Sequence, residues 1–286
     1  MEGISTEKID EFIIAALAED VGDGDHTSLA CIPSDDTSKA KLLVKDEGVI
    51  AGVDFAKRVF QHVDPSAEIE ILIEDGQDIK YGDVAFYVTC NSQALLKAER
   101  LVLNTMQRMS GISTLSSRFA FEVEGIPVTI LDTRKTTPLL RFMEKWAVRI
   151  GGCTNYRDGL YDWMMIKDNH IDACGSITAA VEKAVAYKKT HNKDLGITVE
   201  VRNLVELHEV LQVGQVTRIM LDNFEVPILA EAVATVGKRF ETEASGGVTL
   251  KTVRAIAKTG VDFVSVGALT HSAGSLDLSL KILKGT

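Results

Sequence analysis

Residues 131–170 carry a group of cations whose places along the chain predict an anion-binding pocket. Arg134 and Lys135 follow one apolar run, Lys167 follows a second, and Arg157 lies on the loop between them. This stretch holds seven Lys and Arg against five Asp and Glu, whereas the whole chain has a net charge of −10. Cations placed directly after strands in an acidic protein indicate a site for a small polyanion.

Two carboxylates, Glu200 and Asp222, lie at or near the ends of the next two apolar runs. Cations facing carboxylates across a pocket could form no more than a salt-bridged lid. The alternative is a divided site, in which the cations hold a carboxylated substrate and the carboxylates serve Mg²⁺ or sugar hydroxyls. Each charge-assisted contact contributes about 1.5–3 kcal/mol, so three or four are needed to bring a dianion out of water.

Small residues follow the last two apolar runs. Ser245-Gly246-Gly247 follows one and Gly267-Ala268 follows the other. Small side chains let backbone N–H groups approach phosphate oxygens closely, and barrels commonly bind phosphate on their last two loops. Two glycine-containing turns alone are weak evidence, but their position favours phosphate.

The elements that must position these groups alternate between strand and helix beyond Gly125. The predicted strands are Val128–Leu131, Trp163–Ile166, Ile197–Val201, Arg218–Leu221, Glu241–Ala244 and Phe263–Val266. The predicted helices are Ser176–Lys189, Leu204–Gln212, Val226–Val236 and Thr249–Lys258. This alternation predicts a parallel sheet. Because every strand presents polar or small residues at the same end, we expect a barrel, shortened or irregular, rather than an open sheet.

The pattern of the N-terminal third predicts that it forms a separate, smaller domain. An amphipathic helix is expected at Thr6–Ala18 and a short one at Val53–Val63, with a long helix from Ser92 to about Phe121. The predicted strands are Lys41–Lys45, Val49–Ala51, Ile69–Ile73 and Val84–Thr89. We therefore expect an α/β sandwich over residues 1–112, with 275–286 packing back on it, and a barrel over 113–274 that carries the site.

Composition limits the class of protein. The chain has 286 residues, of which 45% are hydrophobic and 25% charged, and no apolar run approaches the roughly 18 residues of a membrane span. Its N-terminus is polar and acidic, unlike a signal peptide. Four dispersed cysteines without a CxxC pair favour reduced thiols in a cytoplasm over a zinc site or disulfide framework. The negative charge disfavours nucleic acid and anionic membranes as partners.

Ordered motifs along almost the whole chain resemble the quinolinate phosphoribosyltransferase family, also called carboxylating nicotinate-nucleotide diphosphorylases. The matching motifs are Glu19-Asp20 through Gly24-Asp25-x-Thr27-Ser28, Glu99-Arg100-x-x-Leu103-Asn104, Ser110-Gly111-Ile112, Asp132-Thr133-Arg134-Lys135-Thr136-Thr137-Pro138, Lys167-Asp168-Asn169-His170, Leu221-Asp222-Asn223, Glu243-Ala244-Ser245-Gly246-Gly247 and Gly267-Ala268-Leu269-Thr270-His271-Ser272.

The resemblance implies a reaction, a fold and an assembly. Phosphoribosyl would pass from phosphoribosyl pyrophosphate (PRPP) to the ring nitrogen of quinolinate, with loss of pyrophosphate and CO₂, to give nicotinate mononucleotide in NAD biosynthesis. The fold would be an N-terminal α/β sandwich followed by an irregular, seven-stranded α/β barrel of the type II phosphoribosyltransferase kind. The protein would be a Mg²⁺-dependent homodimer.

The resemblance also implies roles for individual residues. Lys135, Glu200 and Asp222 would be catalytic, and the two acids would lie near ribose and Mg²⁺. Substrate contacts would come from Thr133, Arg134, Lys135, Tyr156, Arg157, Lys167, Glu200, Asp222, Ser245, Gly246, Gly247, Gly267 and Ala268. Taken alone, Arg100 on its predicted helix is a solvated or salt-bridged surface residue, whereas the resemblance implies that it reaches the neighbouring subunit's site.

This sequence departs from the family pattern at two positions. Tyr156 stands where the family usually has His, and Leu139 follows Thr136-Thr137-Pro138 where Gly is favoured. A tyrosine can donate a hydrogen bond to a carboxylate but carries no charge at neutral pH. Two alternatives stay open: a related phosphoribosyltransferase for another anionic ring, or a non-catalytic phosphate-binding barrel.

Overall fold

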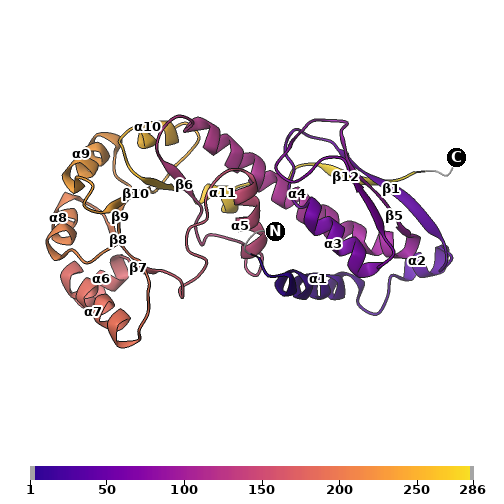
Figure 1. The fold of residues 1–286 in the computed structure, drawn as a ribbon, viewed down its shortest axis with the longest axis horizontal. Helices are drawn as coiled ribbons and strands as arrows, with labels where there is room; N and C mark the ends of the chain where they lie inside the picture. Colours follow the sequence, from indigo (N-terminus) through magenta and orange to yellow (C-terminus); the bar gives the residue numbers. More distant parts are fainter. Residues whose placement is uncertain (1–3, 284–286) are drawn as a thin grey trace. The chain divides into compact units, whose positions relative to one another are not determined.

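The computed structural model describes residues 4–283, which group into two compact units. Among these, the first unit comprises residues 4–117, 142–152 and 273–283, and the second comprises 118–141 and 153–272. This grouping differs from the expected division at residue 112, because the segment 142–152 belongs with the first unit. Figure 1 follows the chain through both units.

The first unit is built on a four-stranded antiparallel sheet in the order β12-β1-β5-β3. These strands are β1 (Thr37–Val44), β3 (Glu68–Ile71), β5 (Val84–Asn91) and β12 (Leu278–Ile282). A two-stranded sheet pairs β2 (Gly48–Val49) with β4 (Asp78–Ile79). Buried and more exposed residues alternate along β1 and β5, as expected for strands with one face on a core. The sequence analysis did not anticipate β4.

Five helices contribute to the first unit: α1 (Thr6–Val21), α2 (His26–Cys31), α3 (Val53–Val63), most of α4 (Ser92–Glu122) and most of α5 (Arg141–Ile150) among the residues described. Asp25 caps the start of α2, because its Oδ1 accepts a hydrogen bond from the Ser28 N–H at 3.1 Å. Helix α5 was not predicted. Its buried positions include the charged residues Glu144 and Lys145 beside an apolar stripe whose helical spacing is present in the sequence, at Phe142, Met143, Trp146 and Ala147.

The second unit contains a six-stranded parallel sheet in the order β6-β11-β10-β9-β8-β7. Its strands are β6 (Thr129–Leu131), β7 (Met164–Ile166), β8 (Ile197–Val201), β9 (Arg218–Asp222), β10 (Glu241–Ser245) and β11 (Phe263–Ser265). The helices are α6 (Asp168–Cys174), α7 (Ile177–Thr190), α8 (Leu204–Val213), α9 (Val226–Val236), α10 (Val253–Ala257) and α11 (Ala268–His271). In Figure 1 the sheet curves with α7, α8 and α9 outside it.

The α/β barrel-like fold was predicted, but within residues 4–283 this sheet has six strands rather than seven. The position between β6 and β7 is held by a single residue, Thr154, which forms an isolated parallel bridge with Leu131. Thr154 N donates to Ile130 O at 2.9 Å, and Asp132 N donates to Thr154 O at 3.0 Å. The residues that follow Thr154 up to β7 form no helix or strand, so pairing ends there.

Within residues 4–283, no helix is long and apolar enough to cross a membrane. All four cysteines are free thiols.

Candidate active site

A cavity of about 630 Å³ opens at the carboxyl ends of the barrel strands, entirely within the second unit. It is lined by Thr133, Arg134, Lys135, Tyr156, Arg157, Met165, Lys167, Glu200, Met220, Asp222, Asn223, Ser245, Gly246, Gly247, Val248, Thr249, Ser265, Gly267, Ala268 and His271. Parallel strands place their carboxyl ends on one side, which is why residues far apart in sequence meet here.

One wall of the cavity is cationic. Arg134 and Lys135 follow β6, and Lys167 follows β7. Burial lowers the pKa of Arg157, and the positive charge of Arg134 lowers it further. Among the residues described, Arg134 Nε is buried without a hydrogen-bond partner. Crowded, partly desolvated guanidinium groups are stabilised by a bound anion, so this wall suits a carboxylated ligand.

The next two strands of the sheet, β8 and β9, carry the two carboxylates. Glu200 of β8 is ion-paired with Lys167. Asp222 ends β9, where its Oδ1 accepts from Ser245 Oγ at 2.8 Å and its Oδ2 accepts from Asn223 Nδ2 at 2.7 Å. These hydrogen bonds fix the Asp222 carboxylate beside the loop that follows β10. The described residues contain no cluster of three or more His, Cys, Asp or Glu side chains suited to a metal ion.

The loop after β10 requires glycine. Gly246 has φ +99° and Gly247 has φ +58°. A Cβ on Gly246 would collide with the side chain of Asn223 and would lie 2.9 Å from its backbone N. The loop is held by Asn223 N, which donates to Ser245 O at 2.8 Å. Residues 245–247 therefore offer backbone without side-chain bulk to the cavity, which suits phosphate oxygens.

Lys135 lies against the second small-residue loop. A Cβ on Gly267 would lie 3.1 Å from Lys135 Cδ, and Thr270 Oγ1 donates to Lys135 O at 2.8 Å. Thr133 Oγ1 accepts from Lys135 N at 3.1 Å. Lys135 therefore lies where the cationic wall meets the loop of Gly267 and Ala268.

The cavity brings together all the predicted site residues except Arg100. Arg100 is an exposed residue of α4 in the first unit. Its predicted role in a neighbouring subunit's site stays a prediction.

Several lining residues were missed by the sequence analysis. Met165, Met220 and Ser265 each lie on a strand, two residues before a predicted site residue that ends that strand or follows it closely. Because side chains alternate along a strand, positions two residues apart point to the same face, and this period could have found them. Asn223 and His271 were part of quoted motifs but not of the predicted site. His271 Nδ1 is hydrogen-bonded to Ser272 Oγ at 2.6 Å.

The two departures from the family pattern have structural consequences. Tyr156 lines the cavity, but its hydroxyl lies 2.6 Å from Thr198 Oγ1. Burial raises the pKa of Tyr156, so the phenol is neutral. A substrate carboxylate would have to compete for that hydroxyl. Leu139 is 91% exposed with φ +65°, the left-handed conformation that favours glycine.

Comparison with known proteins agrees with this geometry along almost the whole chain. The family profile described as "Quinolinate phosphoribosyl transferase, C-terminal domain" matches residues 112–281, and the corresponding N-terminal profile matches residues 25–110. The chain belongs to the quinolinate phosphoribosyltransferase family.

Relatives within this family cover both units. "Quinolinate phosphoribosyltransferase [decarboxylating] 1b" from Nicotiana tabacum is 48% identical over 282 residues, covering 93% of this chain and 80% of that protein. A "probable nicotinate-nucleotide pyrophosphorylase [carboxylating]" from Synechocystis is 40% identical, covering 96% and 93%. The crystal structure of NadC from Streptococcus pyogenes is 35% identical with a TM-score of 0.92, covering 99% of this chain and 100% of that one.

Proposed function

We propose that this chain transfers phosphoribosyl from PRPP to the ring nitrogen of quinolinate with decarboxylation, giving nicotinate mononucleotide, pyrophosphate and CO₂. The observation that carries the proposal is the division of one cavity into a cationic wall and a carboxylate wall beside glycine loops. Relatives of this chain are named for the same activity.

The cationic wall serves quinolinate. Arg134, Arg157 and Lys167 supply more positive charge than a single carboxylate needs, which favours a ring with two carboxylates. The unpartnered Nε of Arg134 is a donor that such a carboxylate satisfies. Binding also orients the ring nitrogen towards the side of the cavity where PRPP lies.

The glycine loops and acids serve PRPP. Backbone at Gly246, Gly247 and Gly267 lies open to phosphate oxygens. As the bond between the ribose carbon and pyrophosphate breaks, positive charge develops on that carbon, and the carboxylates of Glu200 and Asp222 stabilise it. Lys135, next to the Gly267 loop, neutralises the leaving pyrophosphate.

Mg²⁺ fits the donor set. It is commonly bound by one or two carboxylates together with substrate phosphates, so a cluster of three protein ligands is not needed. Glu200 and Asp222 would hold it, and the Asp222 carboxylate is already oriented by Ser245 and Asn223. When bound, the ion would supply charge neutralisation at the pyrophosphate.

Loss of CO₂ follows from the first transfer. Once the ring nitrogen carries ribose, the ring is a pyridinium cation. The bond from the ring to the adjacent carboxylate can then break, leaving its electron pair on the ring carbon next to the positive nitrogen, and a proton takes the place of CO₂. The reaction requires no redox cofactor and no covalent intermediate on the protein.

Our proposal extends to assembly and location. We propose a homodimer in which Arg100 enters the site of the neighbouring subunit. Two observations support this: Arg100 is exposed, and its positive charge would offset part of the negative charge of quinolinate and PRPP. We also propose a cytoplasmic location, supported by the four free cysteines, although one relative from Arabidopsis thaliana is named as chloroplastic.

The test uses quinolinate labelled in the carboxylate next to the ring nitrogen, with PRPP and Mg²⁺. We expect labelled CO₂ in equal amount to nicotinate mononucleotide, and no release with the metal chelated or with Lys135→Ala. Turnover of nicotinate without release from quinolinate would overturn the proposal in favour of a related transferase. Binding of PRPP without turnover of either acid would favour a non-catalytic barrel.

A further inference from the structure

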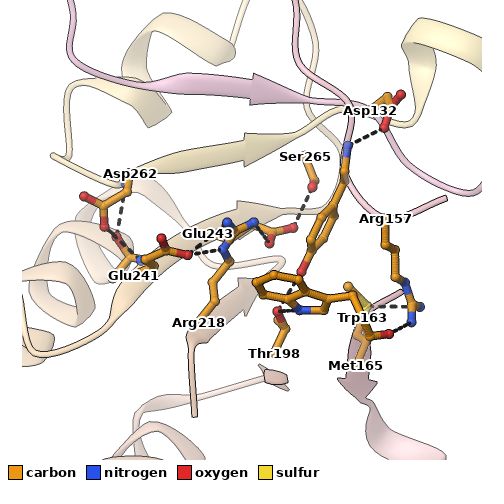
Figure 2. A network of polar contacts seen from close by, with 12 residues as sticks. Asp132, Arg157, Trp163, Met165, Thr198, Arg218, Glu241, Glu243, Asp262 and Ser265 are labelled. Atoms are coloured by element: carbon orange, nitrogen blue, oxygen red, sulfur yellow. Dashed lines mark hydrogen bonds and ion pairs between the residues drawn. The ribbon is translucent and has the colours of Figure 1, made fainter. Parts of the chain in front are cut away.

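Beneath the cavity lies a second layer of polar side chains, drawn in Figure 2. Thr198 lies two residues before Glu200 on β8, and Glu243 lies two residues before Ser245 on β10. Both have no exposed surface, and neither lines the cavity. The hydrogen bonds of Thr198 reach the segment that carries Arg157.

That segment, residues 155–163, forms neither helix nor strand. No ladder of backbone hydrogen bonds therefore fixes the direction of Arg157. Its guanidinium is held by Trp163 O, to which Nη1 donates at 3.2 Å, and more weakly by Met165 Sδ at 3.5 Å from Nη2. The place of Arg157 thus depends on the place of Trp163.

Thr198 ties both flanks of Arg157 to the barrel. Its Oγ1 accepts from Trp163 Nε1 at 2.8 Å and lies 2.6 Å from the Tyr156 hydroxyl. The Tyr156 and Trp163 rings contact each other edge to face, with centroids 6.1 Å apart. One buried hydroxyl on a regular strand therefore contacts both Tyr156 and Trp163, and the Tyr156 backbone N also donates to Asp132 Oδ1 at 2.8 Å.

The chain of hydrogen bonds has a consistent direction. The Tyr156 hydroxyl interacts with the Glu243 carboxylate, which also accepts from Ser265 Oγ at 2.5 Å and from Arg218 Nη1 at 3.3 Å. With Tyr156 donating to Glu243, Thr198 donates to Tyr156 and accepts from Trp163. In this order, each of these hydroxyl and indole protons has an acceptor.

We propose that Thr198 is the positioning residue that aims Arg157 at a substrate carboxylate. This inference rests on the proposed function, in which Arg157 binds quinolinate. Thr198 does not touch the substrate. It acts by holding Tyr156 and Trp163 so that the guanidinium reaches the cavity in one orientation.

The expected effect is on quinolinate rather than on PRPP. Thr198→Val keeps the shape of the side chain but leaves Trp163 Nε1 and the Tyr156 hydroxyl without their shared partner. A misplacement of about 1 Å in a substrate-positioning group costs on the order of 100-fold. We expect the Kd and KM for quinolinate to rise about 10- to 100-fold, with the KM for PRPP within about twofold of wild type.

The experiment measures quinolinate binding by calorimetry and the KM of both substrates for Thr198→Val and Thr198→Ser. Serine keeps the hydroxyl, so it should restore most of the affinity. Thr242→Val is the matched control, because Thr242 is also a buried strand threonine but hydrogen-bonds Asp262 at 2.6 Å. Wild-type affinity in Thr198→Val, or equal losses in the serine variant, would overturn the inference.

A double-mutant cycle tests whether Thr198 acts through Arg157. Thr198→Val combined with Arg157→Ala should bind quinolinate no more weakly than Arg157→Ala alone. Additive losses would overturn the inference. If Thr198→Val does not fold, Trp163→Phe removes the hydrogen bond between Trp163 Nε1 and Thr198 from the other side and replaces it in the cycle, because Trp163 does not line the cavity. Failure of the wild-type protein to bind quinolinate would instead overturn the proposed function.

Discussion

Lys167, at the start of α6, forms an ion pair with Glu200 on the neighbouring strand β8. The pair joins the cationic and carboxylate walls of the cavity directly. The two readings of the sequence, a salt-bridged lid and a divided site, are therefore not exclusive. This ion pair lies within a cavity whose other cations, Arg134, Lys135 and Arg157, line the same space.

The first prediction separates the roles of this pair. Glu200→Gln removes the charge that stabilises the ribose cation, so kcat should fall about 100-fold. The KM for quinolinate should not rise, because Lys167 keeps its charge and loses a competing partner.

Lys167→Met should instead raise the KM for quinolinate about 10- to 100-fold, because it removes a charge-assisted contact. Steady-state kinetics with each substrate varied would measure both effects. The same pattern in both variants would contradict the division of roles.

The second prediction concerns Gly246. Alanine there would combine φ +99° with a collision against Asn223. Strain of about 1–3 kcal/mol corresponds to a roughly 5- to 150-fold increase in the KM for PRPP. Quinolinate binding in the absence of PRPP should be unchanged, and the CD spectrum of the variant is the control for folding. An unchanged KM for PRPP would argue against phosphate binding at this loop.

The third prediction tests the proposed dimer. Arg100→Ala and Lys135→Ala chains should each be inactive. Each mixed dimer should contain one intact site, so random exchange between equal amounts restores activity in about a quarter of all sites. The recovery is measured after unfolding and refolding the chains together, with mass spectrometry to confirm mixed dimers. Mixed dimers without activity would place the whole site within one chain.

The fourth prediction is a pH dependence of stability in the first unit. Asp75 Oδ1 accepts from Val53 N at 2.8 Å, which caps the start of α3, while its Oδ2 is buried without a partner among the described residues. Burial raises the pKa of Asp75 to about 6 from its ordinary 3.8. Between these values the folded state binds more protons than the unfolded state, so this group makes stability fall as pH rises from about 4 to about 6.

Asp75→Asn keeps the acceptor for Val53 N and removes the ionisation. Ionisation of Asp75 lowers the free energy of unfolding by about 3 kcal/mol above pH 7 relative to low pH, and the Asp75→Asn variant should lack this decrease. Urea unfolding at pH 4 and pH 7 measures the difference. Asp75→Ala is the control: it removes the acceptor for Val53 N, which should lower the free energy of unfolding by about 1–2 kcal/mol. An identical pH dependence in wild type and Asp75→Asn would contradict the prediction.

Most of the barrel could be predicted from the sequence because most of its strands are short and apolar and alternate with helical segments. Strand β8 has the predicted bounds, and Glu200 and Asp222 are at or near the strand ends where they were expected. Parallel strands joined by helices must present their carboxyl ends on one side, so polar residues at those ends predict a shared site without coordinates.

The sequence could not predict features that depend on what packs against a residue. In helix α5, Glu144 would ordinarily be placed at a surface, but it is buried and accepts from Arg108 Nη2 at 2.8 Å. The seventh barrel position was expected to be a strand, but a single bridge at Thr154 occupies it. The burial of Glu144 and the bridge at Thr154 have no periodic signal in the sequence, because each depends on a partner distant along the chain.

The cations, carboxylates and glycines of the cavity are determined by the sequence, because their chemistry and their places after strands can be read in order. The tertiary structure alone decided how they are held. It paired Lys167 with Glu200 and placed Thr198 below the cavity, between Tyr156 and Trp163. The physical reason is that a hydrogen bond depends on distance and direction in space, and neither is set by the number of residues between two partners.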